Sequence, residues 1–133
     1  MKFYISSSLQ NVGRVRALSR LLKAAGWEQS YDWTVHCTGQ EIDLDTLRSI
    51  GERELEGVRR SDAVIVLTPR GRGTHAELGM ALALGKRVYL CHDDDTFFKC
   101  DENTSAFYWL PQVNRIVGSL EDIARALLEA QNP

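Results

Sequence analysis

The sequence predicts an α/β protein with a doubly wound parallel sheet of about five strands and helices on both of its faces. Two observations carry this prediction. Short runs of β-branched and aromatic residues alternate with runs whose apolar residues recur every three or four positions. In addition, the run DAVIVLTP (62–69) is almost entirely apolar, which is typical of a strand covered on both faces.

The individual elements follow from these patterns in order. The first strand is KFYIS (2–6), and the helix over 13–25 carries Val15, Leu18 and Leu22 on one stripe before Gly26 ends it. The chain then continues with a weaker strand (27–34), a helix (43–60), the apolar strand (62–69), a helix (74–84), a strand (87–91), a long loop (93–112), a strand (113–118) and a closing helix (119–130). Right-handed crossovers would give a flavodoxin-like sheet, with a ligand crevice at the carboxyl ends of its central strands.

Composition limits the classes of function. The 133 residues are expected to form one domain, and the net charge of −2 offers no basic surface to a nucleic-acid polymer or a membrane. No apolar stretch approaches the roughly 20 residues that span a bilayer, and residues 1–10 lack the features of a secretory signal. The spacing of Cys37, Cys91 and Cys100 matches no zinc site. We therefore expect a cytoplasmic protein with free thiols and no metal or organic cofactor.

The functional reading depends on Glu77 in the segment RGRGTHAELG (70–79). Thr74-x-x-Glu77 is a capping box, in which Glu77 would only bind the backbone of its own helix. However, the segment follows the buried strand through a loop whose glycines, Gly71 and Gly73, let a ligand approach the backbone. The helix N-terminus would keep the carboxylate ionised, as a nucleophile at a sugar carbon must be. Both roles stay open at this point.

The serines that follow the first strand are candidates for substrate binding. Hydroxyl groups and free amides at Ser6, Ser7 and Ser8 suit a phosphate or a ribose hydroxyl, and Arg14 and Arg16 would add positive charge. The same serines would also serve as ordinary loop and capping residues.

Two further side chains are expected near the crevice. Tyr4 lies in the middle of the first strand, facing away from its two neighbours, with its hydroxyl near the crevice or simply packed. Glu54 lies on the apolar stripe of the helix 43–60, where a buried carboxylate needs a partner or a task unless the stripe drifts and exposes it. Burial and the charge of Glu77 would raise the pKa of Glu54, and the two carboxyls would then divide the roles of acid and nucleophile.

The long loop 93–112 is unusually aromatic. Loops of this length tend to be lids, binding loops or subunit contacts. Its aromatic residues would stack on a base, bury a partner subunit or pack on the domain's own edge; they are Phe97, Phe98, Phe107, Tyr108 and Trp109.

Three segments together resemble the nucleoside 2-deoxyribosyltransferase family and the related nucleotide N-glycosidases: KFYISSS (2–8), GERELEGVRRSDAVIVLTP (51–69) and GRGTHAELGMALALGKRVYL (71–90). The resemblance implies one flavodoxin-like domain over 1–133. It implies that Glu77 attacks the anomeric carbon to form a glycosyl-enzyme intermediate, which water or a second base resolves. By the same resemblance, Tyr4 lies near that glutamate and Glu54 contacts the base or the leaving group.

The sequence departs from the family at two places. Aspartate is usual where this chain has Glu54, and many transferases carry an aspartate in the stretch occupied here by Gly71 and Arg72. Arg72 and the serine-rich loop favour a substrate with a 5′-phosphate. The resemblance thus implies hydrolysis or base exchange at the N-glycosidic bond of a nucleoside or nucleoside 5′-monophosphate, by a homodimer or larger homo-oligomer. The expected catalytic residues are Glu77, Glu54 and Tyr4, and the expected substrate-binding residues are Ser6, Ser7, Ser8, Gly71, Gly73 and Thr74.

Two other functions are compatible with the sequence. One is cleavage of NAD by an enzyme of the Toll/interleukin-receptor-like type, which also combines an α/β sandwich with a glutamate. The other is a nucleotide-binding or sensing module without turnover.

Overall fold

The computed structural model describes residues 1–36, 43–68 and 72–131. Within these ranges, five parallel strands form one sheet in the order β2-β1-β3-β4-β5. The strands are β1 (Lys2–Ser6), β2 (Glu28–Gln29), β3 (Ala63–Leu67), β4 (Arg87–His92) and β5 (Val113–Val117). The order confirms the predicted doubly wound, flavodoxin-like sheet, whose winding reverses between β1 and β3.

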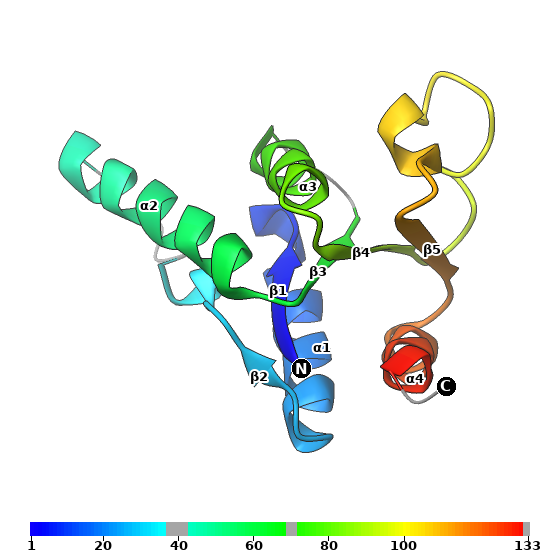
Figure 1. Cartoon of the computed structure of the whole chain (residues 1–133), viewed down its shortest axis with the longest axis horizontal. Helices are drawn as coiled ribbons and strands as arrows, with labels where there is room; N and C mark the ends of the chain where they lie inside the picture. The colour runs from blue at the N-terminus through cyan, green and yellow to red at the C-terminus, as the bar shows by residue number, and fades with distance from the viewer. Residues whose placement is uncertain (37–42, 69–71, 132–133) are drawn as a thin grey trace.

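Helices cover both faces of this sheet. They are α1 (Val12–Ala24), α2 (Leu44–Arg60), α3 (Arg72–Ala83) and α4 (Leu120–Gln131), with short 3-10 helices η1 (Leu9–Asn11), η2 (Trp33–His36) and η3 (Ala106–Trp109). Figure 1 shows α2 and α3 on one face and α1 and α4 on the other, and the helices of each pair contact one another. No helix in the described ranges has the length and apolar character needed to cross a bilayer.

The core lies between the central strands and the helices. All residues of β3 are buried, because this strand has neighbours on both sides and helices over both faces. Tyr4 is also fully buried, in β1, which pairs directly with β3. The strand-like apolar runs of the sequence thus form the interior, and their carboxyl ends define one edge of the sheet.

The predicted strand 27–34 is wrong over most of its length. Strand β2 pairs with β1 only through Glu28 and Gln29, and the chain turns into η2 at Trp33. The cause is local: the carboxylate of Asp32 accepts hydrogen bonds from the backbone N–H of Thr34 at 2.9 Å and from its hydroxyl at 2.5 Å. Such a turn formed by an aspartate side chain diverts the backbone from the sheet.

Helix α3 begins two residues earlier than the predicted start at Thr74, because Arg72 and Gly73 are already helical. This shift moves Thr74 from the expected N-cap into the first turn. The loop 93–112 also differs from the expectation of an irregular segment, because it contains η3, which lies on the α3 side of the sheet next to β5 (Figure 1).

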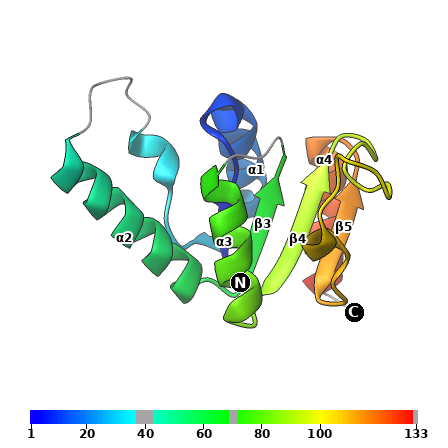
Figure 2. The same ribbon diagram turned by 90° about the horizontal axis from the view of Figure 1, so that it is seen from above.

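Only the C-terminal half of α2 packs on the domain. Gly57 and Val58 are buried, whereas Leu44 is 77% exposed and Leu47 is 55% exposed. Figures 1 and 2 show the beginning of this helix projecting beyond the sheet. The predicted apolar stripe therefore serves the core only from Glu54 onward.

Candidate active site

Glu77 is buried at the carboxyl edge of the sheet and bound by two side chains of β1. Its carboxylate accepts a hydrogen bond from the Ser6 hydroxyl at 2.7 Å and another from the Tyr4 hydroxyl. The side chain of Glu77 is only 6% exposed. Since α3 begins at Arg72, Glu77 is the sixth residue of the helix and points across to β1 rather than back to the helix terminus. In these contacts the carboxylate binds side chains of β1 and not the backbone of its own helix, as the capping box would require. Its catalytic role stays a prediction.

Burial sets the protonation of Glu77. It raises the pKa of this carboxyl to about 7, outweighing the hydrogen bonds from Tyr4 and Ser6, which lower it, while the charge of Glu54 raises it further. The expectation of a fully ionised Glu77 at neutral pH is therefore wrong. The helix dipole acts mainly within the first turn, and Glu77 lies beyond it. Burial and then the charge of Glu77 also raise the pKa of Tyr4, so its hydroxyl stays protonated and acts as a donor.

A cavity of about 440 Å³ opens beside this carboxylate. It lies where β1, η2, α2 and α3 meet, at the winding reversal between β1 and β3. Its lining residues are Ser7, Ser8, Leu9, Gln10, Trp33, Glu54, Arg72, Gly73, Thr74 and Glu77. Most of the residues expected at the site are thus brought together, with Tyr4 and Ser6 supporting Glu77 from β1. Gly71 lies outside the described residues.

Glu54 provides a second carboxyl in the cavity wall. It is half-buried near the middle of α2, and burial raises its pKa. Of the two causes expected from the sequence, burial and the charge of Glu77, only burial raises this pKa appreciably. The cavity therefore contains two carboxyls in different surroundings, one buried and hydrogen-bonded and one more exposed to solvent.

The serines of the first loop have three different roles. Ser6 binds Glu77, while the Ser7 hydroxyl donates to the carbonyl of Leu67 and accepts from Asn11 Nδ2 at 3.0 Å. The buried hydroxyls of Ser8 and Thr74 have no hydrogen-bond partner among the described residues. Both residues line the cavity.

The two arginines expected to add charge here do not line the cavity. Arg14 forms an ion pair with Asp93 and donates to the carbonyl of Thr68 at 3.1 Å, while Arg16 binds the carbonyl of Thr34 at 3.1 Å. Their helix, α1, lies on the other face of the sheet from α3. Among the described residues of the cavity wall, Arg72, which begins α3, carries the positive charge.

Sequence reasoning missed Trp33 as a cavity residue. Its indole N–H donates to the carbonyl of Ile5 at 2.6 Å, which fixes the ring at the carboxyl end of β1. The signal in the sequence was an aromatic residue shortly after an edge strand. It was hidden because the predicted strand extends to residue 34 and so includes Trp33. The aromatic residues of the loop 93–112 do not line this cavity. Tyr108 stacks on His75, and Trp109 lies against the guanidinium of Arg115.

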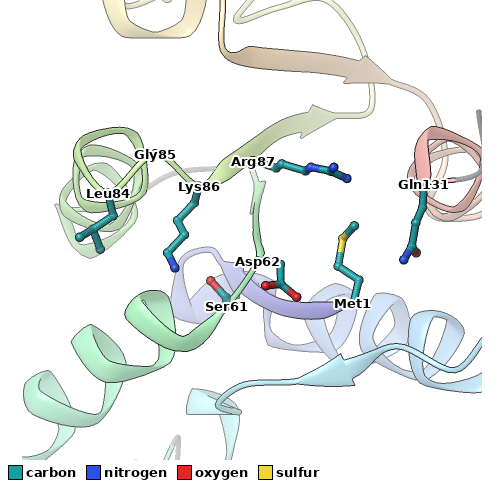
Figure 3. Close-up of a pocket in the computed structure, with 8 residues that line it drawn as sticks. All are labelled: Met1, Ser61, Asp62, Leu84, Gly85, Lys86, Arg87 and Gln131. Carbon is teal, nitrogen blue, oxygen red and sulfur yellow. The ribbon is translucent and has the colours of Figure 1, made fainter.

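A larger cavity of about 560 Å³ lies at the opposite edge of the sheet, at the amino ends of β3 and β4 (Figure 3). Among the described residues that line it, Asp62 is the only carboxylate, and it accepts the backbone N–H of Lys2 at 2.9 Å. Lys86 extends from the wall to the carbonyl of Arg59, 2.6 Å away. With a single acid already engaged with the backbone, this cavity lacks the paired carboxyls of the first.

No group of three His, Cys, Asp or Glu side chains in the described parts of the chain is arranged to hold a metal ion. Among the described residues, the cavity near Glu77 presents two carboxyls, several hydroxyl-bearing residues and Arg72, with the protonated Tyr4 beside Glu77.

Sheet order and cavity position define a flavodoxin-like protein with a cavity lined by two carboxyls at its switch point. The chain belongs to the nucleoside 2-deoxyribosyltransferase family, whose model matches residues 4–114. This membership makes the protein an enzyme that cleaves or transfers a glycosidic bond. None of the curated proteins matches the sequence significantly.

Solved structures share the fold. A CMP N-glycosidase from Clostridium botulinum superposes with a TM-score of 0.66 at 19% identity, covering 96% of this chain and 98% of the other. A 2-deoxyribosyltransferase from Bacillus psychrosaccharolyticus gives 0.71 at 15% identity, covering 93% and 90%. A conserved protein from Enterococcus faecalis gives 0.58 at 18% identity, covering 98% of both chains. At these identities the similarity shows a common fold.

Proposed function

We propose that this protein breaks the N-glycosidic bond of a nucleoside or nucleoside 5′-monophosphate through a covalent intermediate on Glu77. The observation that carries the proposal is the Glu77 carboxylate itself, buried in a cavity wall and held by Tyr4 and Ser6. A carboxylate held in this way is prepared to attack a sugar carbon, and the second carboxyl, Glu54, is available for proton transfer.

In the first step, ionised Glu77 attacks C1′ of the sugar as the bond between C1′ and the base nitrogen breaks. The bonding electron pair leaves with the base, which receives a proton from the carboxylic acid of Glu54. In the second step, water attacks C1′ of the glycosyl-enzyme and gives its proton to Glu54, while Glu77 leaves as a carboxylate. A second base in place of water gives base exchange. Two displacements at C1′ retain its configuration.

Tyr4 and Ser6 fix the nucleophile. Their hydrogen bonds occupy one carboxylate oxygen each and lower the pKa of Glu77 against the effect of burial. A nucleophile with a pKa near 7 is partly ionised at neutral pH and still basic enough to attack. The two donors therefore set both the orientation and the reactive fraction of Glu77.

The cavity is suited to a nucleotide. Its volume of about 440 Å³ falls within the range typical of small-molecule sites. Arg72 in the cavity wall supplies charged donors for a phosphate, and Ser8 and Thr74 line the same wall. The Trp33 ring offers a fixed aromatic wall for a base. A similar fold in a CMP N-glycosidase supports a phosphorylated substrate.

We also expect a homo-oligomer. Four large apolar side chains are exposed on the α2 and η3 segments: Leu44, Leu47, Phe107 and Trp109. Exposed apolar groups of this kind are typical of contact surfaces, and light scattering after size-exclusion chromatography would measure the assembly. A cytoplasmic location stays a prediction.

The test is a panel of ribo- and deoxyribonucleosides and their 5′-monophosphates, assayed by chromatography for free base with and without an acceptor base. We expect base release by the wild type and its loss in Glu77→Gln, with Glu52→Gln on the exposed face of α2 as the matched control. A 2-fluoro-sugar analogue should add its glycosyl mass to the wild type only. Release of nicotinamide from NAD, or tight binding of nucleotides without product, would contradict the proposal.

A further inference from the structure

Gly57 of α2 lies directly against the ring of Tyr4. A Cβ atom at this position would lie 3.0 Å from Tyr4 Cδ2, 3.1 Å from Tyr4 Cε2 and 2.8 Å from Tyr31 Cβ. These separations are shorter than ordinary van der Waals contacts, so any side chain at 57 must displace its neighbours. Gly57 is buried, and its carbonyl accepts the Ser30 hydroxyl at 2.7 Å. Helix α2 thus approaches β1 as closely as a glycine allows.

The Tyr4 ring is confined from two directions. Gly57 contacts the edge of the ring, while the hydroxyl at its tip donates to Glu77 on α3. The backbone of Tyr4 is fixed between neighbouring strands, opposite Val64 of β3. A displaced ring therefore moves its hydroxyl relative to the Glu77 carboxylate, because the backbone cannot follow.

The same glycine also controls the position of Glu54. Glu54 precedes Gly57 by three residues and lies on nearly the same face of α2. If the helix moved outward to make room for a side chain at 57, the Glu54 carboxyl would move away from the cavity wall. One close contact therefore sets the placement of two groups of the proposed site.

We propose that Gly57 is a positioning residue, whose missing side chain lets the Tyr4 ring lie where its hydroxyl reaches Glu77 and brings Glu54 to the cavity. The catalytic part of this inference rests on the proposed function, whereas its structural part concerns only Tyr4 and Glu77. Gly57 itself touches no substrate.

Helix α2 offers a matched control in Gly51. A Cβ at Gly51 would have no atom within 4 Å, and the residue is exposed. Alanine at 51 should therefore strengthen the helix without moving the site. Gly51→Ala and Gly57→Ala make the same chemical change in the same helix and differ in what the new methyl group meets.

The first test follows the titration of Glu77 by NMR of carboxyl-labelled glutamate, with the Glu77 signal assigned by its loss in Glu77→Gln. The hydrogen bond from Tyr4 lowers the pKa of Glu77 more than the charge of Glu54 raises it. We therefore expect Gly57→Ala to move this titration to higher pH by roughly one pH unit, as Tyr4→Phe should. Gly51→Ala should titrate like the wild type, and in a Tyr4→Phe background Gly57→Ala should bring no further shift to higher pH.

Unchanged titration in Gly57→Ala would overturn the inference, as would a further shift to higher pH on top of Tyr4→Phe. If Gly57→Ala alone is too unstable, it is tested in the Gly51→Ala background; a double variant that still does not fold would also overturn it, because the inference requires a folded protein with a displaced ring. None of these readouts depends on turnover. Where base release is observed, the acid limb of its pH profile should shift together with the NMR titration of Glu77. Because the NMR titration needs no turnover, failure of the proposed function can be told apart from failure of this inference.

Discussion

The hydroxyl of Tyr4 donates a hydrogen bond to the carboxylate of Glu77, across 73 positions of the sequence. The contact joins β1 to α3 at the edge of the sheet where the cavity lies. Together with the hydrogen bond from Ser6, this contact provides two donors to a carboxyl group that is buried from solvent. The predictions below follow from the cost of keeping this acid charged in such surroundings.

Glu77 should make the protein less stable as the pH rises. Its pKa is raised from 4.5 to about 7 on folding, so the folded state holds its proton more tightly than the unfolded chain. The resulting stabilisation is fully present below about pH 4.5 and is lost as the pH rises through 7, by roughly 3 kcal/mol at most. We expect Glu77→Gln to remove this slope and to be the more stable protein at pH 8. Urea unfolding at pH 5 and pH 8 measures it, and equal slopes in both proteins would contradict the prediction.

Removing the Ser6 hydroxyl should make Glu77 harder to ionise. Ser6→Ala deletes the 2.7 Å hydrogen bond to Oε1, and hydrogen bonds to a charged group contribute about 1.5–3 kcal/mol. The acid limb of the pH–rate profile should therefore move to higher pH, with the plateau rate changing less. Ser61→Ala is the matched control, because that buried hydroxyl binds the carbonyl of Val58 instead. A shift of equal size in both variants would exclude a specific role for Ser6.

The effect of removing the Glu54 carboxyl on base release should depend on whether the leaving base needs a proton. Glu54→Gln removes the proposed general acid, which is typically worth about 10²–10⁴-fold in rate. A nucleoside whose base already carries a positive charge, such as an N7-methylated purine, leaves without that proton. We expect the loss in base release to be much smaller for such a substrate than for the unmethylated one. Equal losses on both substrates would assign Glu54 to binding instead of proton transfer.

Arg72 should distinguish phosphorylated from unphosphorylated substrates. Arg72→Ala removes the cation of the cavity wall, and we expect KM for a 5′-monophosphate to rise about tenfold, which corresponds to about 1.4 kcal/mol. KM for the matching nucleoside should stay unchanged. Arg16→Ala is the control, because Arg16 binds the carbonyl of Thr34 outside the cavity. An equal rise for nucleoside and nucleotide would argue against phosphate recognition by Arg72.

The sequence predicted the sheet and the place of Glu77 near the cavity because both depend on local patterns. Strand β3 reads as a continuous apolar run, and Glu77 follows it at the start of a helix after a glycine-containing loop. Since parallel strands direct their carboxyl ends to one edge, Tyr4, Ser6 and Glu77 could be expected to meet. Their grouping follows from topology, not from any single motif.

The misplaced parts of the site depend on contacts that the pattern of apolar residues does not indicate. Trp33 was assigned to a strand because the turn made by Asp32 has the same composition as a polar strand end. Arg14 was expected near the crevice, but its helix covers the other face and its charge pairs with Asp93. The closeness of Gly57 to Tyr4 has no local signature, since neither residue's neighbours in sequence indicate how near α2 approaches β1.

The placement of both Glu77 donors on the first strand has a kinetic consequence. Tyr4 and Ser6 precede the acid by more than 70 positions, so closing this loop requires β1 to align with β3 first. Contacts between such distant segments are generally late events in folding. A nascent chain that has emerged only as far as α1 therefore holds the two donors without their acceptor, and Glu77 acquires its raised pKa only once the sheet that shields it has assembled.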